Sequence, residues 1–308
     1  MTPRPIWIDT DPGFDDLVTL ALTAHHRSSL PLIGVSVVAG NAPLERTLRN
    51  ALVVAETFEI TAPIYAGCAR PLVRPGVSAE NVLGVGAFGT VGAKLPEPLQ
   101  MASDGHGALR LLEAARQMPG ELTLVAIGPL TNIALAMQLE PALPKLLREI
   151  VIMGGSSERG NHTAAAEFNF YADPEAASVV LNSGAPIALF GLNLTRQVLL
   201  SPPHIERVRR GRSSHATALA DMMAHYLQIR RGAAMPLHDP VTVAYLLHPE
   251  LFELQAANVQ IELTGTHTLG MSVCEFRVPA RGEANARVAI NTQGEAVIEI
   301  VLEALTLR

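Results

Sequence analysis

Cysteine, excess positive charge and long hydrophobic runs are all scarce in this sequence, and each shortage narrows what the protein can be. The two cysteines, Cys68 and Cys274, lie far apart and have no partners at metal-ligand spacing. This favours free thiols in a reducing compartment over a disulfide framework. Lys and Arg number 23 against 29 Asp and Glu, which gives a net charge of −6. We therefore expect no nucleic-acid partner, because such proteins carry dense basic patches.

No stretch reaches the roughly 18 consecutive apolar residues of a membrane-spanning helix. The N-terminus also lacks the charged segment and apolar run of a secretion signal. These absences predict a cytoplasmic protein with no membrane partner. With 308 residues, 48% of them hydrophobic, the chain can bury a large core. No repeat or linker divides it, so we predict one domain over residues 1–308.

Short β-branched runs alternate with segments of helical periodicity along most of the chain. This rhythm is typical of βαβ units and predicts an α/β fold with a Rossmann-like core. The sheet should be open, twisted and mostly parallel, with helices on both faces. Strands are expected at 5–8, 32–39, 63–66, 122–127, 149–153, 187–191 and 288–291, with a hairpin at 259–263 and 268–277. Helices are expected at 17–24, 43–58, 108–118, 130–139, 173–181, 203–210, 214–230, 241–247 and 295–307.

Two segments interrupt this rhythm. Residues 67–105 are rich in Gly and Pro and show little periodicity. A connection of that length is usually a functional flap or a disordered loop. A second long loop is expected between the glycines at 154–155 and residue 173.

Four carboxylates, those of Asp9, Asp11, Asp15 and Asp16, follow the first expected strand within eight residues. A Pro-Gly turn separates the two pairs, and the second pair opens a helix. The acids thus lie at the carboxyl end of a strand, where open α/β sheets bind ligands. Bonds to turn amides and helix capping would account for some of them. Four repelling acids together favour a hard cation, Ca²⁺ or Mg²⁺. Zinc is disfavoured because no Cys or His interleaves them.

Further polar residues follow other strand ends. Asn41 ends the second strand, Ile127 precedes a Gly-Pro turn, and Met153 precedes two glycines. The second long loop adds Asn161, Glu167 and Asn169 to the same edge of the sheet. One crevice could collect them all. Singly, they are ordinary turn or surface residues. Beside a metal site they favour a sugar or another polyol.

His238 and Asp239 form a third feature, directly before a proline. A histidine is often structural, and Asp before Pro commonly starts a helix. A neutral imidazole near a leaving group can instead act as a general acid, because its pKa lies near the working pH. His106, between two glycines, is a second and weaker candidate.

Six sequence blocks point to a known family. In order they are D-T-D-P-G-F-D-D, V-V-A-G-N, I-G-P-L-T-N-I-A, V-I-M-G-G, A-E-F-N-F-Y-A-D-P-E-A and H-D-P. In this order and spacing the chain resembles the nucleoside hydrolase family, commonly called inosine-uridine-preferring nucleoside hydrolases. The resemblance covers nearly the whole chain.

The resemblance implies calcium-dependent hydrolysis of the N-glycosidic bond of ribonucleosides to free base and ribose, by homodimers or homotetramers. The residues that match calcium ligands are Asp11, Asp16, Asp239 and the backbone carbonyl of Ile127. Asp11 also matches the base that deprotonates the attacking water. The residues that match ribose-binding positions are Asp15, Asn41, Met153, Asn161, Glu167 and Asn169. His238 matches a residue beside the nucleobase and is our candidate acid for the leaving base.

Leu83 departs from the family pattern. Many members carry a His in the flexible loop at this place, and Leu cannot transfer a proton. The nucleobase preference therefore stays open. Two alternative functions also stay open: a ribose- or nucleoside-binding relative without catalysis, and a Mg²⁺-dependent phosphatase of the haloacid dehalogenase type using Asp9 and Asp11.

Overall fold

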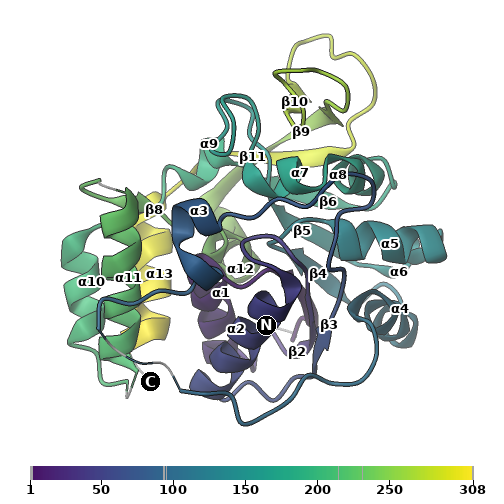
Figure 1. Cartoon of the computed structure of the whole chain (residues 1–308). Coiled ribbons are helices and arrows are strands. Elements are labelled where there is room, and N and C mark those ends of the chain that lie inside the picture. The colour runs from purple at the N-terminus through teal and green to yellow at the C-terminus, as the bar shows by residue number, and fades with distance from the viewer. Residues whose placement is uncertain (1–2, 93, 95, 214, 231, 307–308) are drawn as a thin grey trace.

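Nine strands form one sheet across residues 3–92, 94, 96–213, 215–230 and 232–306, the part of the chain described by the computed structural model (Figure 1). The strand order is β10-β9-β11-β6-β5-β4-β1-β2-β3. The parallel strands are β1 (Ile6–Thr10), β2 (Leu32–Val37), β3 (Ile64–Ala66), β4 (Thr123–Ala126), β5 (Glu149–Met153), β6 (Ile187–Phe190) and β11 (Ala286–Thr292). Strand β9 (Phe252–Ile261) pairs antiparallel with β11 and with β10 (Ser272–Glu275).

Helices cover both faces of this sheet. One face carries α1 (Phe14–His25), α2 (Leu44–Thr57), α12 (Pro240–Leu247) and α13 (Gly294–Thr306). The other carries α4 (Gly107–Gln117), α5 (Thr131–Leu139), α6 (Leu143–Leu146) and α8 (Pro174–Leu181). Figure 1 shows α10 (Pro202–Arg209) and α11 (Ala216–Arg230) stacked beside α13. The shorter elements are α3 (Glu80–Leu83), α7 (Phe168–Ala172), α9 (Leu192–Thr195), the 3₁₀ turns at Val85–Ala87 and Pro249–Leu251, and the strand pair β7 (Leu199–Leu200) and β8 (Met235–Pro236).

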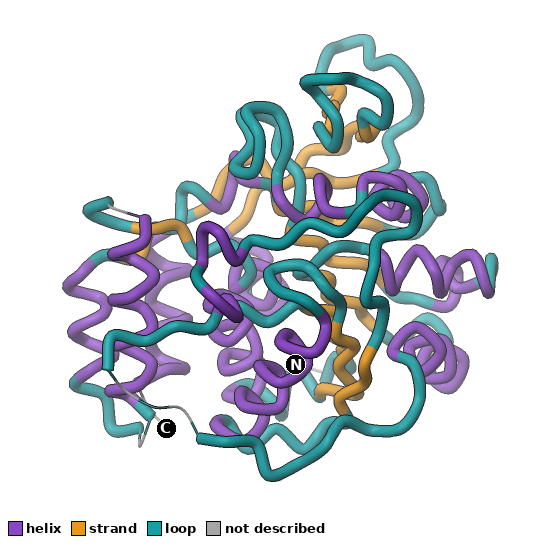
Figure 2. Tube along the Cα trace, in the orientation of Figure 1, coloured by secondary structure: helices purple, strands orange, loops and turns teal. Residues whose placement is uncertain are grey.

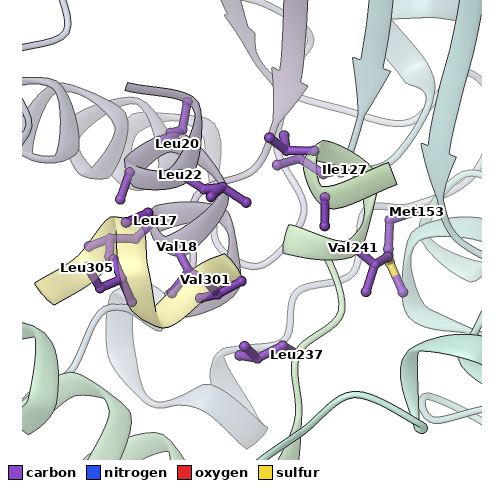
Figure 3. Packing of buried hydrophobic residues seen from close by; sticks show 14 of the residues in the cluster. Leu17, Val18, Leu20, Leu22, Ile127, Met153, Leu237, Val241, Val301 and Leu305 are labelled. Carbon is purple, nitrogen blue, oxygen red and sulfur yellow. The ribbon is translucent and has the colours of Figure 1, made fainter. Parts of the chain in front are cut away.

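Alternate residues of the central strands enter two separate cores. Ile6 and Ile8 of β1 pack on the α1 side, whereas Trp7 between them packs on the α4 side, and none is more than 2% exposed. A parallel sheet with both faces covered requires such continuous apolar strands. On the first face, Leu17 and Val18 of α1 lie beside Leu305 and Val301 of α13 (Figure 3).

The predicted fold class is confirmed: the sheet is mostly parallel and has helices on both faces. Most predicted elements occur within about three residues of their expected bounds. Residue 214, where one helix was expected to begin, and residue 307, where the last was expected to end, lie outside the described residues. None of the described helices combines the length and apolarity needed to cross a membrane.

Two expectations were wrong in detail. The second long loop contains a helix, α7, just before residue 173. The first strand of the hairpin begins at Phe252, seven residues before its expected start, because its early residues pair with β11. The segment between β3 and α4 is loop for most of its length, interrupted by α3 (Figure 2).

The order of the strands reverses beside β1. From β1 the chain moves outward through β2 to β3, then crosses back to β4 on the opposite side of β1. In open α/β sheets, ligands bind outside the carboxyl ends of the strands at such a reversal. The acidic turn follows β1 and Ile127 follows β4, so both lie at this point.

Candidate active site

The carboxylates of the acidic turn are held by specific hydrogen bonds. Thr10 Oγ1 donates to Asp16 Oδ1 at 2.5 Å, and the backbone N–H of Gly13 donates to Asp16 Oδ2 at 2.9 Å. The N–H of Asn41 donates to Asp11 Oδ2 at 2.6 Å. Asp11 Oδ1 is buried and has no hydrogen-bond partner among the described residues. A buried acceptor left without a donor costs stability, and a cation would satisfy it.

A second group of oxygen atoms fits a cation. Carboxylate oxygens of Asp15, Asp16 and Asp239 lie within 4.8 Å of one another. Burial raises the pKa of Asp239 well above its usual range, and the charges of Asp15 and Asp16 raise it further. Burial likewise raises the pKa of Asp11, with the charge of Asp16 adding to it. A cation would offset both penalties. A donor set made only of oxygens suits Ca²⁺ or Mg²⁺.

Two glycines leave room for the Asp11 side chain. A Cβ atom at Gly40 would lie 2.1 Å from Asp11 Oδ2, and a Cβ at Gly128 would lie 2.7 Å from Asp11 Oδ1. These glycines follow β2 and β4. The ends of the two strands on either side of β1 thus form a slot that any larger residue would narrow.

A pocket open to solvent lies at the same edge of the sheet. All the predicted ribose-binding residues line it, as do Ile127, His238 and Asp239. Asp11 and Asp16 do not line the pocket. Asp239 does line it, and the charges of Asp11 and Asp16 raise the pKa of the Asp239 carboxyl. The structure therefore brings the predicted metal-binding and sugar-binding residues to one place.

Glu167 fixes the start of α7, which forms one side of this pocket. It caps α7, accepting at Oε1 from the N–H of Asn169 at 2.9 Å and at Oε2 from the N–H of Phe170 at 3.1 Å. Burial raises the pKa of Glu167 to about 7, while these N–H donors oppose the rise. Asn169 Nδ2 in turn donates to the carbonyls of Ile127 (3.0 Å) and Met153 (3.2 Å). A carbonyl oxygen has two lone pairs, so Ile127 O can still accept a ligand.

Hydrogen bonds connect the side of the pocket formed by α3 to the acidic turn. Asn50 Nδ2, on α2, donates at 2.8 Å both to the carbonyl of Pro12 in that turn and to the carbonyl of Gly86 after α3. Glu80 of α3 accepts from Arg46 and from the N–H of Gly86. Helix α2 therefore fixes the position of α3, whose last residue, Leu83, lines the pocket.

Comparison with known proteins decides the family. Residues 6–299 match the family model described as inosine-uridine preferring nucleoside hydrolase. The chain belongs to this family. Nucleoside hydrolases are N-ribohydrolases. An inosine-uridine preferring nucleoside hydrolase of Crithidia fasciculata is 39% identical over 98% of each chain. The pyrimidine-specific ribonucleoside hydrolase RihB of Escherichia coli is 37% identical over 94% of this chain and 93% of its own. The solved structure of a plant nucleoside hydrolase, PpNRh1, superposes with a TM-score of 0.92 at 28% identity, covering 99% of this chain and 100% of the other.

Family membership sets Asp9 in context. Asp9 is fully buried, accepts from the hydroxyl of Ser36 and from Asn132 Nδ2 at 2.8 Å, and is not among the pocket-lining residues. Burial raises its pKa to about 7. A phosphatase nucleophile has to reach its substrate. The geometry therefore gives no support to the alternative of a haloacid-dehalogenase-type phosphatase that uses Asp9 and Asp11.

Three further residues concern the leaving base of a nucleoside hydrolase. His238 is buried, and its Nδ1 lies 2.8 Å from Thr195 Oγ1. His106 instead caps α4 by accepting from the N–H of Ala108, lies 4.0 Å from Cys68 Sγ, and does not line the pocket. Leu83 does line it, so the departure from the family pattern falls inside the site.

Sequence reasoning missed five lining residues: Ala79, Val82, His162, Phe168 and Tyr226. Tyr226 comes from α11 and stacks on Phe14, with ring centroids 5.0 Å apart. Nothing in the sequence linked α11 to the site. His162 also lines the pocket. It directly follows the candidate Asn161, and that adjacency was a usable signal.

Proposed function

We propose that this chain hydrolyses the N-glycosidic bond of ribonucleosides, with a calcium ion held by Asp11, Asp16, Asp239 and the carbonyl of Ile127. One observation carries the proposal. The unpartnered Asp11 Oδ1 and the closely spaced oxygens of Asp15, Asp16 and Asp239 lie at the strand-order reversal, beside a pocket lined by Asn and Glu side chains. The names of the relatives support a nucleoside as substrate.

The residues divide the work as follows. When bound, calcium would supply positive charge that orients ribose hydroxyls and makes a nearby water more acidic. Asp11 takes the proton of the attacking water. Asn41, Glu167 and Asn169 hold the ribose in position, which contributes by proximity. As the bond to the base breaks, positive charge develops on the sugar ring. The surrounding carboxylates stabilise that charge.

The leaving base needs a proton or a hydrogen bond. We assign the Thr195 hydroxyl as the donor to His238 Nδ1, which leaves the proton of the neutral ring on Nε2,. We propose that this Nε2–H donates a proton or a hydrogen bond to the leaving base. Leu83 contributes only apolar contact.

The test is a panel of ribonucleosides assayed for free base, with added calcium and after chelation. We expect turnover that is lost on chelation and restored by calcium. Asp11→Ala should lower turnover by several orders of magnitude, because general-base and positioning losses combine. It should weaken binding less, since the ribose contacts remain. Near-normal turnover in that variant, or full activity after chelation, contradicts the proposed roles.

The same assay separates the alternatives. Ribose binding without turnover would favour a non-catalytic relative, and phosphate release from nucleotides would favour a phosphatase. We also propose, from the resemblance and the composition, a single-domain cytoplasmic protein that assembles as a homodimer or homotetramer. Light scattering on the purified protein measures the assembly directly.

A further inference from the structure

His162 brings a second imidazole to the pocket besides that of His238. Its side chain is exposed and lines the pocket, which places it at the mouth. Its ring contacts Tyr171 at a centroid distance of 4.4 Å and Phe168 at 5.4 Å. The two aromatic rings hold the imidazole in one region while leaving it accessible to a ligand.

The surroundings of His162 differ from those of the acidic residues. Partial burial alone lowers the pKa of His162, without a contribution from any of the site's carboxylates. The lowered pKa favours the neutral form of the imidazole. A neutral imidazole both donates and accepts a hydrogen bond.

The pocket has two chemically distinct parts. Carboxylates and amides suit a cation and ribose hydroxyls, while Val82, Leu83, Phe168 and Tyr226 present apolar or aromatic surface. A flat nucleobase requires apolar walls with a few polar groups at its edge. His162 contacts Phe168, so it belongs to the second part.

We propose that His162 contacts the nucleobase of the bound substrate through one hydrogen bond at its edge, and so determines which bases are accepted. This rests on the proposed nucleoside hydrolysis. The imidazole would supply a hydrogen bond in the apolar part of the pocket, where the Leu83 side chain cannot form one.

The experiment compares three substrates: inosine, uridine and 4-nitrophenyl riboside, which has the same sugar but lacks a nucleobase. His162→Phe keeps an aromatic ring against Phe168 and Tyr171 but loses the hydrogen bond. Its kcat/KM should fall about tenfold on at least one nucleoside, the size of one hydrogen bond, and by different factors on the two. Hydrolysis of the nitrophenyl riboside should change less than about twofold. His162→Gln, which can still donate and accept, should recover part of the loss.

His267→Phe is the matched control, since His267 is exposed and does not line the pocket. It should leave all three rates unchanged. An equal loss on all three substrates in His162→Phe would place the imidazole against the sugar and overturn the proposal, as would no loss on any. A wild-type protein that hydrolyses none of them refutes the proposed function itself, and the wild-type arm alone reveals that.

Discussion

Gly40→Ala adds a single methyl group next to the proposed general base. The new Cβ would lie 2.1 Å from Asp11 Oδ2 and 2.8 Å from Pro129 Cδ, whereas ordinary contact begins at 3.4 Å. Gly40 is not a positive-φ residue, so its backbone accepts alanine and the effect is steric. Asp11 cannot simply rotate, because Asn41 N–H holds Oδ2 at 2.6 Å and the carboxylate also lies against Gly128.

Relieving the contact requires a displacement of Asp11 or its loop by about 1 Å, and a misplacement of that size costs roughly 10²-fold in rate. We therefore expect kcat on inosine or uridine to fall about 100-fold, with weaker calcium binding. Both are measured by steady-state kinetics at several calcium concentrations, with thermal unfolding to verify the fold. Gly76→Ala is the control, because its Cβ would meet only Pro71 Cδ at 3.6 Å. A folded Gly40→Ala protein whose kcat stays within about threefold of wild type would refute the role given to Asp11.

Two other substitutions probe the base-side acid and the fold. His238→Ala should slow inosine hydrolysis by about 10²–10⁴-fold, the usual size of a general-acid contribution, yet leave 4-nitrophenyl riboside nearly unaffected; equal slowing would show that His238 only supports the site. Glu149→Ala removes a carboxylate whose side chain is 10% exposed and which pairs with two arginines at 2.5 Å each. Chemical denaturation should show that the free energy of unfolding falls by about 1–3 kcal/mol. For Glu97→Ala, whose side chain is 77% exposed in the wild-type protein, the free energy of unfolding should stay within about 0.5 kcal/mol of the wild-type value.

The parts of the fold that the sequence predicts well are those set by local pattern. Strand β5 occurs over residues 149–153 as expected, because its uninterrupted apolar run can only be buried on both faces,. The acidic turn was predictable for a related reason. A strand that ends in a Pro-Gly turn has to deliver its next side chains to the carboxyl edge of the sheet, whatever the rest of the chain does.

The parts that were missed depend on contacts between distant residues. Helix α7 has five residues, too few to form alone. It exists because Glu167 caps it, and the N–H of Gly155, just after β5, holds the Glu167 carboxylate in place. The early part of β9 is a strand only because β11 lies beside it. Tyr226 reaches the pocket because α11 packs near α3, more than 130 residues away in the chain. No periodicity within α11 contains that information.

The two halves of the pocket are built from different kinds of structure. The proposed metal and ribose contacts come from the ends of β1, β2, β4 and β5, from the starts of α1 and α12, and from α7 and the loop before it. The residues that directly follow the strands are positioned by the sheet, whereas Asn161, Glu167 and Asn169 are positioned by α7 and the loop before it. The apolar half comes from α3, α11 and the loop that carries His162.

Residues of that apolar half can change without disturbing the sheet, because loops tolerate substitution better than the strands they join. Relatives whose names state different base preferences share 37–39% identity with this chain along nearly its whole length. A shared sugar site with a variable base site accounts for both facts. Base preference should therefore depend on Leu83, His162 and Tyr226, while substitutions at Asp11, Asn41 or Asn169 should affect all ribosides alike.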